Sequence, residues 1–344
     1  MNKLKKASSY FPIFVSLMLC LATFSSSALT VFTPDIDVSE PAVSSETKTA
    51  GGRPLKDYIS SAYCETASSS ASQAVSADKS KAVGKIYEQF LSPYSAKLSY
   101  GGVYIKNTTG QTVDIKKELG EKLKFKIEKN SEPQVLIVHT HATECYMEEA
   151  RDFYTTADKS RTTDNSKNVT EIGEIFAKKL ESGGIKVIHD RTKHDHPSYN
   201  QSYSRAAETI KEYLNKYPSI KIVVDVHRAS IALTKNDKAK PTVTVNGKKA
   251  AQVMLVVGCE AGSVTGFPNW RENFRLSLKY QQTMEALYPG LARTMAFAPR
   301  KYNLHLTTGS MLLEVGTDSN SFEEAKYSAE LAGDALLSLL NTLK

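Results

Sequence analysis

Apolar positions recur along this chain with two different periods, which predict strands and helices in turn. From about residue 130 onward, short runs of β-branched residues are each followed by a longer stretch with apolar residues three or four apart. The runs predict strands at residues 135–138, 185–188, 220–226, 294–298 and 310–315. The longer stretches predict helices at residues 168–180, 202–217, 269–287 and 322–343. This order predicts an α/β domain with a mixed, mostly parallel sheet flanked by helices.

Two further features interrupt this alternation. Asn246 and Gly247 separate the two β-rich arms of residues 241–257, and an Asn-Gly pair between such arms is the strongest short-range hairpin signal. Residues 145–167 are polar and carry no clear period. A loop of that length is unusual in a compact domain unless it frames a site.

The residues before the α/β domain predict a small segment of their own at 78–130. Asp78 is suited to cap a short helix that ends near Leu91. Residues 101–115 alternate on both sides of a turn at 107–110, which predicts a β-hairpin. The α/β domain is therefore expected to be a separate domain at residues 131–344.

The amino-terminal residues predict export from the cytoplasm. Three lysines precede the apolar run at residues 11–24, and small residues follow that run. This layout is typical of an export signal, so residues 1–32 are expected to be a cleaved signal peptide or a retained membrane anchor. Residues 33–77 are rich in Ser, Ala and Thr and predict a flexible linker. The rest of the chain is then secreted, or anchored with its domain outside the cytoplasm.

Composition restricts the class of protein less sharply than the pattern does. The chain has 344 residues, of which 41% are hydrophobic, and this content supports a large core and excludes a disordered protein. The formal net charge is +7, and the lysines are scattered rather than gathered on one stripe. Such a balance favours anionic surroundings without selecting nucleic acid, wall polymer or membrane. No nucleic-acid partner is expected.

The first predicted strand, at residues 135–138, ends in a group of polar residues with metal-binding chemistry. His139, His141 and Glu144 follow it directly. Ligands bind at the carboxyl ends of strands in open α/β sheets. Continued alternation would place both histidines on one face, with Thr140 opposite, and Glu144 within reach of the same point. Imidazole and carboxylate are ligands that zinc accepts, and catalytic zinc usually has three protein ligands.

Two later strands add the residues that such a site still needs. His227 ends the strand at 220–226, so it is expected at the same sheet edge as His141. Glu314 lies inside an apolar strand, where an unpaired carboxylate is costly, and a catalytic base fits that position. Arg228 is placed to hold a substrate carboxylate or an oxyanion, with a surface salt bridge as the alternative. Asp225 is suited to orient an imidazole or to cap the end of its strand.

The other histidines and the cysteines indicate less about the function of the chain. His139 is better suited to orient a ligand than to bind metal itself. Three histidines are expected in a polar loop that lines or approaches the cleft: His189, His194 and His196. Cys20 lies in the apolar amino-terminal run, and the other three cysteines are an odd number, so no structural disulfide is expected. Cys145 is interpreted as a small buried hydrophobic residue.

Several ordered motifs within residues 100–344 resemble the stage II sporulation protein P family of endospore-forming bacteria. They are VLIVHTHATECY at 135–146, DNSKNV at 164–169, VIHD at 187–190, YNQSYSR at 199–205, DVHR at 225–228 and GSMLLEVGTDSN at 309–320. The resemblance implies a membrane-anchored, zinc-dependent N-acetylmuramoyl-L-alanine amidase with a fold like other cell-wall amidases. It also implies endopeptidase activity on peptide cross-links. The implied partners are stage II sporulation proteins D and M, which act with it in engulfment of the forespore.

The resemblance also implies roles for particular residues. His141 matches the first zinc histidine of such amidases, His227 the second, and Glu314 the catalytic glutamate. Glu144 is favoured as the middle ligand, because its spacing resembles that in zinc carboxypeptidases. Asp164 or Glu171 are the alternatives for that ligand. Members of the family tend to carry an acidic residue after the Asp-x-His-Arg motif, whereas this chain has Ala229.

These residues together predict a hydrolase. Water activated by Glu314 and polarised by zinc would attack the amide between the muramic acid lactyl group and L-alanine. Protonated Glu314 would then return the proton to the leaving amine. Two rival functions remain: a metallopeptidase that cleaves stem-peptide cross-links with the same residues, and a non-catalytic wall-binding scaffold.

Overall fold

Strand order places the three strands that carry the predicted site next to one another in an eight-stranded sheet. The computed structural model describes residues 77–130 and 132–343, which lie in one compact unit. In spatial order the strands are β2 (Leu98–Tyr100), β3 (Val103–Asn107), β11 (Met295–Ala298), β10 (Val253–Gly258), β12 (Ser310–Thr317), β7 (Ile222–Ala229), β4 (Val135–Val138) and β6 (Val187–His189). All neighbours pair in parallel except β2 with β3 and β10 with β12. The predicted mixed, mostly parallel sheet is confirmed.

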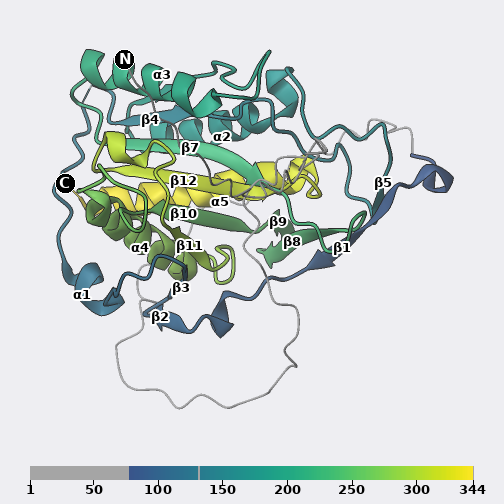
Figure 1. Cartoon of the computed structure of the whole chain (residues 1–344), viewed down its shortest axis with the longest axis horizontal. Coiled ribbons are helices and arrows are strands. Elements are labelled where there is room, and N and C mark those ends of the chain that lie inside the picture. The colour runs from purple at the N-terminus through teal and green to yellow at the C-terminus, as the bar shows by residue number, and fades with distance from the viewer. Residues whose placement is uncertain (1–76, 131, 344) are drawn as a thin grey trace, which may run out of the picture. The chain divides into compact units, whose positions relative to one another are not determined.

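Helices cover both faces of this sheet (Figure 1). They are α1 (Ile115–Gly120), α2 (Val169–Ser182), α3 (Ser202–Lys216), α4 (Trp270–Leu287) and α5 (Phe322–Asn341). On β4, Val135 and Ile137 pack in the core that contains α2, α4 and α5, whereas Leu136 and Val138 pack toward α3. This split follows from the two-residue period of a strand. Both faces are buried, so the strand is apolar throughout.

Local signals explain where the long helices begin and end. Asn168 caps α2 by accepting a hydrogen bond from the Thr170 N–H at 2.9 Å, and Gly183 terminates the same helix. Ser321 and Glu324 form a reciprocal capping box at the start of α5. The predicted helices at 168–180, 202–217, 269–287 and 322–343 are all confirmed, with ends within a few residues of the prediction.

A second, four-stranded sheet lies beside the first. Its strand order is β5 (Phe153–Tyr154), β1 (Gly84–Gln89), β8 (Lys238–Val245) and β9 (Lys248–Ala251). Asn246 and Gly247 form the tight turn between β8 and β9 with positive φ angles of 50° and 77°, as their sequence predicts. The predicted second arm continues past Ala251, however, as β10 of the larger sheet.

Two predictions for the first described residues are wrong. The helix expected from Asp78 to Leu91 is a short 3₁₀ turn followed by strand β1, because β1 pairs along both edges with β5 and β8. The hairpin expected around residues 107–110 turns instead at Gly101 and Gly102, where φ is 58° and 84°. Its strands β2 and β3 complete the edge of the eight-stranded sheet.

The predicted signal or anchor at residues 1–32 and the linker up to residue 76 lie outside the described residues. Within the described residues, no helix is both long and apolar enough to cross a membrane.

The close pairing of β7 with β12 makes Gly309, just before β12, a sensitive position. A Cβ atom at this residue would lie 1.9 Å from the Lys221 carbonyl oxygen, and backbone cannot easily move aside. We expect Gly309→Ala to lower the free energy of unfolding by about 1–3 kcal/mol or more, measured by urea denaturation. Gly120→Ala is the matched control, since nothing lies within 4 Å of a Cβ there. Equal stability of the two variants would contradict the close packing of these strands.

Candidate active site at the carboxyl ends of β4, β7 and β12

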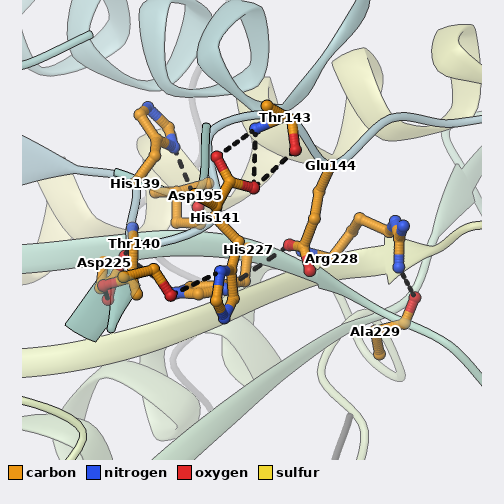
Figure 2. Close-up of polar contacts among 12 residues, drawn as sticks. His139, Thr140, His141, Thr143, Glu144, Asp195, Asp225, His227, Arg228 and Ala229 are labelled. Carbon is orange, nitrogen blue, oxygen red and sulfur yellow. Dashed lines mark hydrogen bonds and ion pairs between the residues drawn. The ribbon is translucent and has the colours of Figure 1, made fainter. Parts of the chain in front are cut away.

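The candidate site lies where three adjacent parallel strands end. His227 on β7 is the direct register partner of Glu314 on β12, so the two side chains project from the same face. The neighbouring strand β4 ends at Val138 and leads into the turn that carries His141 and Glu144 (Figure 2). Parallel strand ends meet at one sheet edge, and the predicted convergence of His141, Glu144, His227 and Glu314 is observed.

Two buried aspartates hold the turn after β4 in place. Asp225 accepts hydrogen bonds from the N–H of Thr140 at 2.9 Å and from its hydroxyl at 2.6 Å. Asp195 accepts from the Thr143 hydroxyl at 2.5 Å and from the guanidinium of Arg161 at 2.7 Å. The turn is thereby tied both to β7 and to the loop after β6, which orients the residues that follow Thr140.

His227 lies between two carboxylates. Its Nδ1 is 3.5 Å from Oε2 of Glu144, and its Nε2 is 2.9 Å from Oδ1 of Asp225. Burial lowers the pKa of His227, but the charges of Asp225 and Glu144 more than offset this, so the pKa lies well above its usual value. The two carboxylates therefore favour a positive charge at this imidazole.

His141 has a different environment. Its ring stacks on Tyr199 with 4.5 Å between ring centroids, and its Nε2 is 3.0 Å from the Tyr199 hydroxyl. Its Nδ1 is 3.3 Å from the Ser202 hydroxyl, and its ring lies edge-on to His227 with centroids 5.3 Å apart. Burial and the nearby His227 lower the pKa of His141 to about 4. The imidazole is neutral near pH 7 and keeps a lone pair that can bind a metal ion.

Glu144 is fully buried and ionised. Its Oε2 accepts a hydrogen bond from the backbone N–H of Arg228 at 3.1 Å, and its Oε1 is 3.6 Å from the guanidinium of Arg161. Burial raises the pKa of Glu144, but the positive charges of Arg228 and His227 outweigh this, so the pKa is well below its usual value. Oε1 makes no hydrogen bond within the described part of the chain.

Glu314 is buried with little compensation. Burial raises its pKa to about 7, against the lowering effect of His227 and with a further rise from Glu144. Its Oε2 lacks a hydrogen-bond partner among residues 77–130 and 132–343. A carboxyl group with a pKa near 7 can both take up and release a proton at neutral pH, as a general base or acid must.

The side chain of Arg228 points away from this group, contrary to its expected role as a clamp for substrate (Figure 2). Its guanidinium donates to the backbone carbonyls of Cys145 at 3.1 Å, Ser160 at 2.7 Å and Ala229 at 3.3 Å. Arg228 is buried, so it is not a surface salt bridge either. It ties the loop after Glu144 to the end of β7.

The prediction that His139 and His141 share a face is wrong. His139 lies 2.9 Å from the Val226 carbonyl through Nδ1 and 2.9 Å from Nε2 of His189 through its own Nε2. Its ring packs against Gly173 of α2, on the other side of the sheet from α3 (Figure 2 shows it directed away from His227). Strand alternation ends at Val138, and the following turn sends the two imidazoles apart.

The other expected histidines and acids lie away from the site. His189 pairs with Glu174 at 3.1 Å, His194 lies 3.4 Å from Asp190, and His196 is exposed. Asp164 is exposed and caps a 3₁₀ turn, and Glu171 on α2 forms no hydrogen bond or ion pair with His141 or His227 in the described structure. Of the three candidates for the middle ligand, Glu144 is the one beside His227.

Several residues of the site were not singled out by the sequence. Tyr199 and Tyr203 flank the start of α3 and contact His141, and Tyr203 also stacks on His227 with centroids 6.5 Å apart. Both tyrosines belong to the motif YNQSYSR at 199–205, but Tyr199 precedes α3, so helical periodicity does not predict that they meet at His141. Arg161 and Asp195 lie in loops, where periodicity indicates nothing about position. Cys145 and Cys259 are free and buried.

This chain is similar to known proteins in sequence and, in part, in structure. A family model described as Stage II sporulation protein P (SpoIIP) matches residues 56–337. The chain belongs to this family. A curated member, the stage II sporulation protein P of Bacillus subtilis (strain 168), is 30% identical over 212 residues, which cover 58% of this chain and 49% of the relative. The alignment thus spans about half of the relative's length.

Solved structures with partial likeness include several amidases. The CwlD amidase from Clostridioides difficile, in complex with the GerS lipoprotein, is 13% identical with a TM-score of 0.38 and covers 61% of this chain and 99% of its own. The amidase Ami1 from Mycobacterium abscessus is 12% identical with a TM-score of 0.36 and covers 62% of this chain and 98% of its own. TM-scores and identities of this size establish neither a common fold nor a common activity.

The donor set suits zinc in its chemistry, and one donor-to-donor spacing is that of two zinc ligands. Two donor atoms on a tetrahedral zinc ion lie about 3.4 Å apart. His227 and Glu144 are 3.5 Å apart, and the rings of His141 and His227 are 5.3 Å apart. The contact of Asp225 with His227 resembles the carboxylate that commonly orients a zinc-binding histidine. Within the described ranges, however, no three or more His, Cys, Asp or Glu side chains are grouped as metal ligands.

The hydrogen bonds of the Arg228 guanidinium predict that substitution of this residue lowers the stability of the fold. Lysine cannot reproduce the planar fork that donates to three carbonyl oxygens, so buried acceptors would lose their partners. We expect Arg228→Lys to lower the free energy of unfolding by about 2 kcal/mol or more in urea denaturation. The exposed Arg300→Lys serves as control and should change stability by less than about 0.5 kcal/mol. An Arg228→Lys protein as stable as the parent would return Arg228 to a role in substrate binding.

Proposed function

We propose that this chain is a zinc-dependent peptidoglycan hydrolase that cleaves the amide between N-acetylmuramic acid and the L-alanine of the stem peptide. The observation that carries the proposal is the buried Glu314, with a pKa of about 7, beside two histidines and a second glutamate at the carboxyl ends of parallel strands. Burying these two glutamates costs free energy of folding, because their carboxylates lose their hydration. Membership of the sporulation family supports a role in sporulation.

The residues that would hold zinc are His141, Glu144 and His227. His141 is neutral at pH 7, and Glu144 is ionised, which are the states in which these side chains bind metal. At His227 the carboxylates of Asp225 and Glu144 favour a positive charge. A bound zinc ion would supply that charge in place of a proton. Zinc in such a site acts as a Lewis acid on the amide carbonyl and acidifies water.

The chain's own residues account for the proton transfers. Ionised Glu314 takes a proton from the attacking water as the oxygen–carbon bond forms at the amide carbonyl. As the carbon–nitrogen bond breaks, the protonated Glu314 gives this proton to the leaving amine. Asp225 keeps His227 in its orientation, and Tyr199 and Tyr203 fix the ring of His141. Arg228 keeps the loop after Glu144 in place.

The setting of this activity is part of the proposal. We infer that the chain is exported and acts on the cell wall, either anchored to the membrane by its amino-terminal residues or secreted after their removal. We further infer that it acts in forespore engulfment with stage II sporulation proteins D and M. The catalytic domain is proposed to span residues 131–344, and strands β1 to β3 are hydrogen-bonded into its two sheets.

Replacement of the proposed base tests the hydrolase directly. Glu314→Gln removes proton transfer while keeping the size of the side chain, so digestion of purified peptidoglycan should slow by about 100-fold or more. Glu330→Gln is the control, because Glu330 is exposed on α5. Circular dichroism checks that both variants fold.

Mass analysis of the fragments distinguishes the candidate reactions. Free stem peptides together with intact glycan strands identify the amidase, and cut cross-links identify an endopeptidase that uses the same residues. Activity of Glu314→Gln equal to that of the parent would instead point to a scaffold without this chemistry.

Zinc affinity tests the ligand set independently of activity. Competition with a chromophoric chelator should show that Glu144→Gln and His227→Ala raise the Kd for zinc by more than about 100-fold, because each removes a direct ligand. Glu171→Gln and Asp164→Asn should bind zinc like the parent. Loss of affinity in either of these controls, with Glu144→Gln unaffected, would move the middle ligand to that residue.

A further inference from the structure

A cavity opens on the same face of the large sheet as Glu314. Met254 of β10 is the direct register partner of Glu314, and Ala296 of β11 pairs with Val256 of β10 and with Lys106 of β3. Register partners, and residues two apart on a strand, project from the same face. Met254, Ala296 and Lys106 line a cavity of about 610 Å³. The cavity therefore lies over β10, β11 and β3, on the face of the sheet from which Glu314 projects.

Arg293, two residues before β11, lines this cavity and is buried. Its exposed fraction is 4%, and its Nε and Nη2 make no hydrogen bond to any described residue. Burial lowers its pKa to about 10, and Glu314 opposes this lowering, yet no ion pair joins the two in the described chain. A buried guanidinium with unused donors is costly to fold unless an anion pairs with it.

The lining of the cavity combines cationic and apolar residues with the neutral polar residues Ser92, Ser95, Asn107 and Thr294. Lys97 and Lys106 line it together with Arg293, and none of its lining residues is Asp or Glu. Its walls include Phe90, Leu98 and Met254. A short peptide with small apolar side chains and a carboxylate matches them.

We propose that Arg293 is a substrate-binding residue that pairs with a carboxylate of the peptide whose amide bond Glu314 hydrolyses. The inference rests on the proposed function and adds a specificity subsite to it. The guanidinium forms charge-assisted hydrogen bonds with the carboxylate through its unused donors, and the peptide lies along Phe90, Leu98 and Met254. The cleaved amide lies near Glu314, and the carboxylate lies on the Met254 side of that residue.

Binding by a catalytically inactive protein tests this subsite without turnover. The full chain carrying Glu314→Gln is titrated in a calorimeter with an N-acetylmuramoyl tripeptide that ends in a free carboxylate, and with the same compound ending in a carboxamide. We expect the carboxylate to bind at least about tenfold tighter. Adding Arg293→Met should abolish this ratio and leave carboxamide binding unchanged. Adding Arg293→Lys should retain part of it, because the charge remains without the fork.

Two controls separate a subsite from a structural role. Arg300→Met, at an exposed position on the loop after β11, should keep the tenfold ratio. Arg293→Met should keep or raise the midpoint of thermal unfolding, since an unpaired buried charge is removed. A lower midpoint, with equal loss of binding for both compounds, would make Arg293 structural and overturn the proposal. Equal affinity of the parent for both compounds would overturn it as well.

These outcomes are distinct from failure of the hydrolase proposal. Wall cleavage by the unsubstituted chain without carboxylate preference in binding would overturn the subsite alone. Carboxylate-selective binding that depends on Arg293, without any wall cleavage, would overturn the hydrolase and support a peptide-binding site on the same sheet face.

Discussion

The parallel pairing of β7 with β12 is the constraint on which the site depends. It sets His227 of one strand directly beside Glu314 of the other, on one face of the sheet. The neighbouring strand β4 is parallel to β7, so its carboxyl end delivers His141 and Glu144 to the same edge. A shift of one residue in either register would turn His227 or Glu314 to the opposite face, into the core formed by α2, α4 and α5. The chemistry is thus a property of the sheet rather than of one loop.

The buried charges of the site are stabilised by hydrogen bonds and by opposite charges, and some of these groups have more such partners than others. Glu144 is compensated by the Arg228 N–H, by Arg161 and by His227. Asp225 is compensated by Thr140 and His227. Glu314 has no hydrogen-bond partner for its Oε2 among the described residues, and its pKa rises in consequence. The unequal environments push the pKa values of two nearby carboxylates apart, which separates a ligand role from an acid–base role.

Uncompensated groups also mark the direction in which the site extends. Arg293 and Glu314 are both buried on the Met254 side of the sheet. Arg293 has unused N–H donors, and the Oε2 of Glu314 has no hydrogen-bond partner among the described residues. The two groups have opposite charges and act on each other electrostatically without forming an ion pair in the described structure. Burying the two groups without an ion pair between them costs free energy of folding. A substrate that interacts with both groups would offset this cost when it binds.

The sequence by itself determined the class of fold and most of the site. Apolar runs and amphipathic stretches predict the strands and helices from residue 135 onward, and parallel α/β connectivity then predicts that His141 and His227 meet at one edge. Only the tertiary structure decided the strand state of β1, the separation of His139 from His141, the partners of Arg228 and the burial of Arg293. The physical reason is that periodicity reports which face of its own element a residue occupies. The contacts made across elements depend on strand register and on the path of turns, and neither is encoded locally.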